Sequence, residues 1–145
     1  MPTAIHRRVE QCRQGADPTL IAKLESGWAV FGERQFLRGY ALLLPDPVVP
    51  HLNALSDAAR RQFLDDMARL GDAVLGATAA LRINYAMFGN LEPALHAHVI
   101  PRFEAEDPKF ATQHPWAYDW NAAPLFDRER DAALLAAVRA GLTST

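Results

Sequence analysis

Two histidines separated by one residue, His96 and His98, are the side chains of this sequence best suited to chemistry. They lie in the apolar run 95–103, which predicts a β-strand. Residues two apart on a strand point to the same face, so the two imidazoles are expected to project together. The apolar residues between and beside them would then point to the opposite face, where a helix can cover them.

Three interpretations fit such a pair of imidazoles. In the first, each ring hydrogen-bonds the backbone or a carboxylate and has only a structural role. In the second, the pair binds a metal ion such as zinc, which requires a third ligand, and the candidates are His51 and His114. In the third, one imidazole attacks phosphorus while the other donates a proton to the departing oxygen. The spacing by itself leaves all three open.

The residues around the pair resemble a known family signature. The run 94–102, Ala-Leu-His-Ala-His-Val-Ile-Pro-Arg, resembles that of the histidine-triad (HIT) superfamily, in which three histidines alternate with apolar residues on a strand. It is similar in particular to bacterial diadenosine polyphosphate hydrolase-like HIT proteins, whose histidines are followed by Ile-Pro-Arg. The segments Ile83-Asn84-Tyr85, Gly89-Asn90 and 39–45 extend the resemblance, which covers residues 12–120.

The resemblance implies hydrolysis of a nucleotide phosphoanhydride or phosphoramidate through a nucleotidyl-histidine formed on His96. By position, His98 would assist the leaving group and bind phosphate. Asn84, Asn90 and Arg102 are the candidate substrate- and phosphate-binding residues, although turn or strand structure could explain the asparagines and simple solvation the arginine. The implied substrate is a small nucleotide and the implied assembly a homodimer. This chemistry requires neither a metal nor another cofactor.

Two positions depart from the family pattern. Ala94 stands where the first histidine of the triad is expected, and Val48 stands where these proteins carry a further histidine. His51, three residues later, is a possible substitute. Losing groups that orient a catalytic imidazole commonly costs about one to three decades of rate. We therefore expect either a hydrolase that is slow or altered in its leaving-group preference, or a nucleotide-binding protein with little or no turnover.

The elements that must position these residues follow from hydrophobic periodicity and turn residues. The sequence predicts an α+β fold that is HIT-like, with an antiparallel sheet of about five strands, one long covering helix and a C-terminal helix. We expect one domain over residues 1–145, with a core at about 12–120 and a C-terminal helical extension at about 125–143. The predicted strands are 20–24, 28–31, 39–44, 80–88 and 95–103, and the predicted helices are 3–13, 57–78 and 127–142.

The helix predicted at 57–78 has the clearest pattern. Ser56 is its expected N-cap. Its apolar positions recur with helical spacing and are expected to cover the sheet. The side chains expected to face water are Arg60, Arg61, Asp65, Asp66 and Arg69.

Aromatic residues outside the histidine strand have two interpretations each. In the cluster 116–120, Trp116 or Trp120 could stack on a base, but we favour a role in anchoring the long loop 104–124. Trp28 and Phe31 lie on a strand that the resemblance associates with a nucleoside pocket. Core packing explains these two residues equally well.

Composition limits the partners and the compartment. A net charge of -2 over 145 residues argues against nonspecific nucleic-acid binding, which needs a basic excess. Cys12 is the single cysteine, so no disulfide forms within the chain. The first residues carry no apolar signal core, and no stretch reaches the length of a membrane span. The expected location is the cytoplasm, with no membrane partner.

Overall fold

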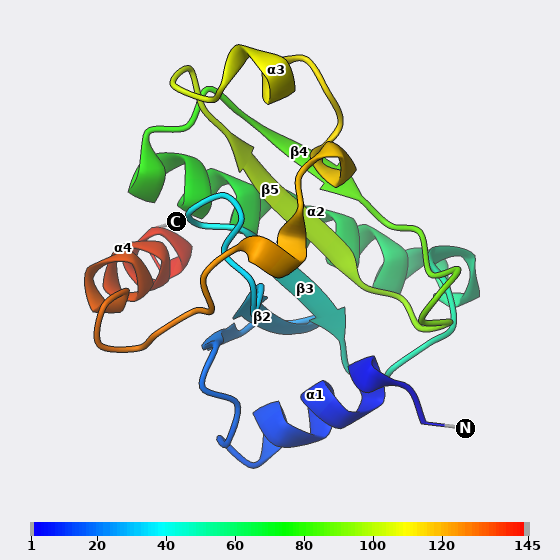
Figure 1. Cartoon of the computed structure of the whole chain (residues 1–145). Coiled ribbons are helices and arrows are strands. Elements are labelled where there is room, and N and C mark those ends of the chain that lie inside the picture. Colours follow the sequence, from blue (N-terminus) through cyan, green and yellow to red (C-terminus); the bar gives the residue numbers. More distant parts are fainter. Residues whose placement is uncertain (1, 144–145) are drawn as a thin grey trace.

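A computed structural model describes residues 2–143. Its centre is a five-stranded antiparallel sheet with the order β1-β2-β3-β5-β4 (Figure 1). The strands are β1 (Leu20–Lys23), β2 (Gly27–Phe31), β3 (Ala41–Pro45), β4 (Arg82–Ala86) and β5 (Ala97–Arg102), and the helices are α1 (Ala4–Arg13), α2 (Asp57–Thr78), the short α3 (Pro108–Ala111) and α4 (Ala132–Thr143). The predicted fold class is confirmed, and each observed strand lies within two residues of its predicted bounds.

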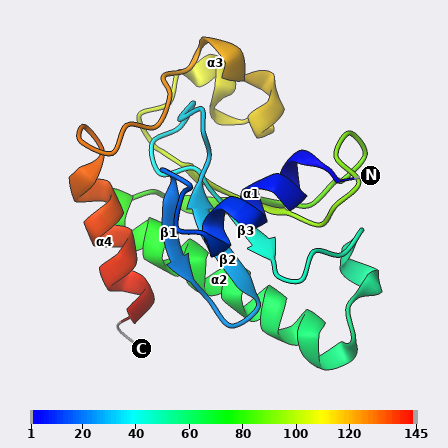
Figure 2. The same cartoon turned by 90° about the horizontal axis from the view of Figure 1, so that it is seen from below.

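Alternating side chains give the sheet two buried faces. Figure 2 shows α1 and α2 on opposite sides of the strands. One face packs against α2 and α4 and includes Leu43, Ala97 and Val99. The other face packs against α1 and includes Leu42 and Ile100. The sequence prediction that the apolar residues beside the histidine pair face the long helix is therefore confirmed.

The long helix α2 begins at its predicted cap, because the Ser56 hydroxyl accepts a hydrogen bond from the Ala59 N–H at 3.2 Å. One expectation about its exposed face is wrong. Asp66 is only 1 % exposed, since its carboxylate accepts hydrogen bonds from the Ser26 N–H and the Gln62 amide, both at 2.9 Å. This carboxylate ties α2 to the β1–β2 turn. No helix in the described part of the chain is long and apolar enough to cross a membrane.

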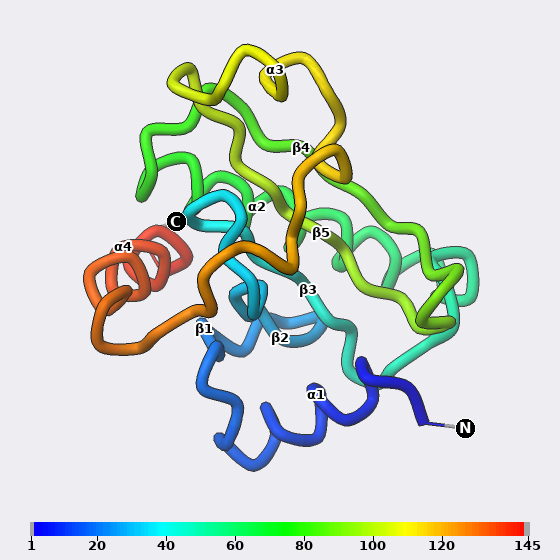
Figure 3. The backbone as a smooth tube through the Cα atoms, in the orientation of Figure 1, coloured from blue at the N-terminus to red at the C-terminus, as the bar shows by residue number. Residues whose placement is uncertain are grey.

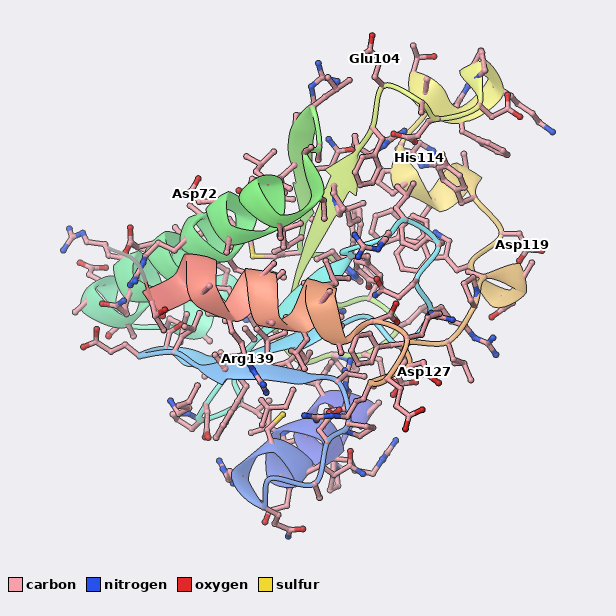
Figure 4. All side chains as sticks on the ribbon, turned by 90° about the vertical axis from the view of Figure 1, so that its left-hand side faces the viewer. Asp72, Glu104, His114, Asp119, Asp127 and Arg139 are labelled. Carbon is pink, nitrogen blue, oxygen red and sulfur yellow. The ribbon has the colours of Figure 1, made fainter. Side chains whose placement is uncertain are left out.

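The C-terminal helix α4 belongs to the main core rather than forming an extension beyond it. Its buried residues Leu134, Leu135, Val138 and Leu142 share one cluster with Phe63 and Leu70 of α2. Arg139 points from α4 toward β1 (Figure 4), where its guanidinium donates to the Ile21 carbonyl at 2.7 Å. The helix starts at Ala132, later than predicted, because residues 127–131 form turns closed by the Asp127 and Asp131 carboxylates.

The segment 104–124 runs across the sheet on the side of α1, as the tube in Figure 3 shows between α3 and α4. It carries two short 3-10 turns, Pro115–Ala117 and Trp120–Ala122. Tyr118 and Trp120 pack against the buried cluster that contains Leu42 and Ile100. This segment therefore covers the end of the sheet face from which the histidine pair projects.

Candidate active site

His96 and His98 lie together at the N-terminal end of β5, as the sequence predicts. The strand begins at Ala97, so His96 immediately precedes it. The ring centroids are 5.1 Å apart. Both rings line a groove of about 1060 Å³, whose other walls come from β4, from residues 88–92 and from residues 114–116. Figure 4 shows His114 on the segment that follows α3.

One hydrogen bond determines which nitrogen of His96 is available. Its Nδ1 lies 2.7 Å from the Ala94 carbonyl oxygen. A carbonyl oxygen only accepts, so Nδ1 carries a proton, and in the neutral ring Nε2 keeps its lone pair. The acceptor comes from the backbone, and the Ala94 side chain itself is fully buried. Residue 94 thus orients the His96 ring through its main chain.

His98 is held in a different environment. Its Nδ1 lies 2.7 Å from the Tyr40 hydroxyl, and the rings of Trp116 and Trp120 lie at 5.1 and 6.0 Å. Burial lowers the pKa of His98 to about 4, with a smaller contribution from His96. The imidazole is therefore neutral near pH 7.

Tyr40 is a site residue that the sequence analysis missed. Burial raises the pKa of its hydroxyl well above the usual value, so the group stays protonated and can donate to His98. The ring fits closely against Gly32, where any Cβ atom would collide with it. Only the pairing of distant strands brings Tyr40 to the site. Leu42 pairs with His98 across β3 and β5. Tyr40 lies two residues before Leu42 and therefore shares its face of the sheet.

The two candidate asparagines both line the groove. The Asn84 side-chain oxygen accepts a hydrogen bond from Arg102 Nη1 at 2.9 Å. This contact orients the amide and leaves its N–H groups for the groove. Asn90 is exposed and follows Gly89, whose φ of 75° fits the predicted turn. Both residues therefore lie where a substrate could reach them.

Arg102 is neither solvated at the surface nor placed in the groove, the two positions that the sequence allows. The residue is 5 % exposed and does not line the groove. All five of its N–H groups are used, on Glu106, on Asn84 and on the Phe110 and Gln113 carbonyls. Arg102 therefore holds the segment 104–124 against the sheet, and no N–H group of its side chain remains for a phosphate.

Glu106 is the ion-pair partner of Arg102, and the two side chains form a clamp that holds this segment to the sheet. Burial opposes ionisation of Glu106, but hydrogen bonds from Arg102 and Tyr118 hold its pKa below the usual value. The Tyr118 hydroxyl donates to the carboxylate at 2.5 Å. The clamp thereby positions the chain that carries the tryptophans beside His98.

The aromatic residues divide between the two interpretations. Trp120 is an anchor: its indole donates to the Pro115 carbonyl at 2.9 Å, and its ring stacks on Phe36 at 4.0 Å. Trp116 lines the groove and meets Phe88 edge to face at 5.0 Å. Phe31 is fully buried against Phe126 in the core.

Within residues 2–143, no group of three His, Cys, Asp or Glu side chains is placed to hold a metal ion. His114 lines the groove, while His51 lines a neighbouring hollow of about 280 Å³ that His96 also lines. Val48 packs against the apolar cluster under α1.

Solved structures share this architecture. A histidine triad (HIT) protein of Sinorhizobium meliloti matches with a TM-score of 0.75 and 20 % identity, over 97 % of each chain. The chain has the histidine-triad fold. A hypothetical histidine triad nucleotide-binding protein of Sulfolobus tokodaii matches with a TM-score of 0.71 and 14 % identity, over 92 % of this chain and 89 % of that one.

A zinc-bound histidine triad family protein of Mycobacterium smegmatis also has this fold, with a TM-score of 0.64 and 21 % identity over 89 % of this chain and 87 % of that one. No protein-family model and no curated protein sequence matches the chain. At these identities the likeness establishes the histidine-triad fold, and it extends beyond the stretch 12–120 on which the sequence resemblance rests.

Proposed function

We propose that the chain hydrolyses a nucleotide at its phosphorus atom through a nucleotidyl-histidine intermediate on His96. The observation that carries the proposal is the hydrogen bond from His96 Nδ1–H to the Ala94 carbonyl at 2.7 Å. It leaves Nε2 unprotonated on a ring that lines the groove, and a neutral imidazole is a competent nucleophile near pH 7.

The resemblance implies two roles for His98, assisting the leaving group and binding phosphate, and its environment favours the second. In the tautomer in which the Tyr40 hydroxyl donates to Nδ1, the neutral ring carries its proton on Nε2. This N–H and the Asn84 amide are neutral donors that can hold the phosphoryl oxygens as charge develops. A ring with a pKa of about 4 is a poor source of a proton at pH 7. We therefore assign His98 as the phosphate ligand rather than the leaving-group acid.

His96→Asn tests the nucleophile. In single-turnover reactions with a panel of dinucleoside polyphosphates and adenosine 5′-phosphoramidate, we expect the substitution to lower the rate on the order of 10⁴-fold or more. The wild-type protein should also form a nucleotidyl adduct that intact-mass measurement detects and that the variant lacks. His6→Asn is the matched control, because His6 is exposed on α1 and does not line the groove. Equal rates in wild type and His96→Asn would refute the assignment.

A second candidate is a nucleotide-binding protein without turnover. What favours it is Ala94, which the sequence resemblance aligns with the first triad histidine and which is fully buried. A histidine at this position would add a third imidazole to the sheet face that carries His96 and His98. Saturable nucleotide binding by wild type, with no adduct and no product, would support this candidate over the hydrolase.

We also propose that two copies pair through β4. Among the described residues it is an edge strand of the sheet, so one row of its backbone groups has no strand partner. Leu81, just before β4, and Tyr85, within it, are 55 % and 41 % exposed. Light scattering should give twice the chain mass of 16.0 kDa. Leu81→Asp should shift the mass toward one chain, whereas Leu125→Asp, on a distant exposed leucine, should not. A monomeric wild type would contradict the pairing.

A reducing, cytoplasmic location is proposed on the cysteine content. Cys12 is the single cysteine of the chain and lies on the buried face of α1. Burial raises the pKa of its thiol to about 12, so it is poorly reactive. This residue needs no oxidising compartment to fulfil its packing role.

A further inference from the structure

The groove must contain a proton donor if its leaving group is a poor one. A group that leaves phosphorus with the bonding electrons needs a proton unless it forms a stable anion. Among the described residues that line the groove, the side chains that can titrate are Tyr85, Glu92, His96, His98 and His114. The first four are held so that none of them has a proton for a leaving group.

Neither histidine of the pair can supply the proton. His96 Nδ1–H is bonded to the Ala94 carbonyl at 2.7 Å, and Nε2 is the proposed nucleophile. Burial lowers the pKa of His98 to about 4, so its ring is neutral near pH 7 and carries one proton. Losing that proton would give an imidazolate, unless the Tyr40 hydroxyl at 2.7 Å became a buried tyrosinate in its place. Burial raises the pKa of Tyr40, so this transfer is unfavourable.

Tyr85 and Glu92 have other partners. The Tyr85 hydroxyl packs against Gly71 of α2, the helix that covers the sheet face opposite the histidine pair, and burial raises its pKa. The Glu92 carboxylate accepts a hydrogen bond from the Ala4 N–H at 3.2 Å, in the first turn of α1. Near pH 7 a carboxylate in such a contact accepts hydrogen bonds and carries no proton.

His114 combines a fixed backbone with a free imidazole. The Gln113 carbonyl before it accepts a hydrogen bond from Arg102 Nη1 at 2.8 Å. Pro115 after it is buried, and the Pro115 carbonyl accepts from the Trp120 indole at 2.9 Å. Among residues 2–143, no hydrogen bond or ion pair occupies the His114 imidazole, and the residue is exposed. The chain is thus held on both sides of a ring that remains available.

The position of His114 suits proton transfer in the groove. It lines the groove together with His96 and His98. Trp116, two residues later, meets the His98 ring edge to face at 5.1 Å, so this turn faces the proposed phosphate ligand. Imidazole is the side chain whose charge changes near neutral pH, and an exposed ring exchanges protons with water. Such a ring can be reprotonated in every turnover, which buried His98 cannot.

We propose that His114 is the general acid that protonates the leaving group, an inference that rests on the hydrolase function proposed above. His96 Nε2 forms a bond to phosphorus while the bond from phosphorus to the leaving atom breaks. The leaving atom keeps the electron pair and takes the His114 proton. Water then attacks phosphorus, the bond to Nε2 breaks with its electron pair returning to His96, and neutral His114 takes the water proton. Both histidines are restored.

The test is how strongly the effect of His114→Gln depends on the leaving group. Adenosine 5′-phosphoramidate releases ammonia, which leaves only with a proton, whereas the p-nitrophenyl ester of adenosine monophosphate releases a stable phenolate. We compare kcat/KM, which reports the steps up to formation of the nucleotidyl-histidine. His114→Gln should lower it about 100-fold or more for the phosphoramidate and by less than about threefold for the ester, as expected for loss of a general acid. His6→Gln, on an exposed histidine of α1, is the matched control and should change neither value.

The outcomes separate this inference from the proposed function. Equal losses for the two compounds would show that His114 shapes the groove rather than donating a proton, and would overturn the inference. Unchanged values in His114→Gln would overturn it too, and so would a larger phosphoramidate loss in Glu92→Gln. In each of these cases the hydrolase function stands if cleavage depends on His96. No cleavage of either compound that depends on His96 would overturn both proposals.

Discussion

Replacing Arg102 by methionine is expected to lower the free energy of unfolding by about 3–5 kcal/mol, the usual cost of removing one partner of a buried ion pair. The guanidinium and Glu106 are 6 % and 4 % exposed, so the remaining carboxylate would stay buried without its cation. The Phe110 and Gln113 carbonyls would lose their donors at the same time. Urea denaturation followed by circular dichroism measures the loss.

The controls distinguish the buried charge from simple truncation. Arg60 pairs with Asp57 on the exposed side of α2, and Arg60→Met should cost less than about 1 kcal/mol. The double variant Arg102→Met/Glu106→Leu removes both charges and should be more stable than Arg102→Met. A loss below 1 kcal/mol for Arg102→Met would mean that the clamp does not hold the segment. Tryptophan emission should shift to longer wavelength in the same variant, because Trp116 and Trp120 lie on that segment.

His98 is expected to titrate near pH 4 in the folded protein, about 2.5 units below the reference value of 6.5. Because its folded pKa is depressed, the unfolded chain binds the proton more tightly between pH 4 and 6.5. The contribution of neutral His98 to stability is therefore complete above pH 6.5 and is lost as the pH falls toward 4. At 1.36 kcal/mol per unit, the difference amounts to about 3 kcal/mol.

Nuclear magnetic resonance of ¹⁵N-labelled histidine measures both the pKa and the tautomer. The wild-type ring should carry its proton on Nε2 down to about pH 5. Tyr40→Phe removes the donor to Nδ1 and should allow both tautomers. The difference in unfolding free energy between wild type and His98→Gln should change by about 3 kcal/mol between pH 7 and 4. An ordinary pKa near 6.5 would show that Trp116 and Trp120 do not shield this ring.

Local signals determined much of this protein from its sequence. The apolar period of α2 and the hydroxyl of Ser56 specify a helix and its start, since both act within a few residues. The alternation along β5 predicted that His96 and His98 share a face and that their neighbours face α2. The resemblance around residues 94–102 predicted the histidine-triad fold. The assignment of residues 1–145 to one domain and the roles of the site residues stay predictions.

Only the tertiary structure decided what surrounds the two imidazoles. Tyr40 is 58 residues from His98 in sequence, and they meet because β3 and β5 pair in one register. Arg102 is polar and terminates a strand, a pattern typical of a solvated or ligand-binding residue. It is buried because the segment 104–124 folds back and supplies four acceptors to its guanidinium. The sequence gives the type of each side chain and whether it can carry a charge. Its partners and its exposure to water depend on which distant segments pack beside it.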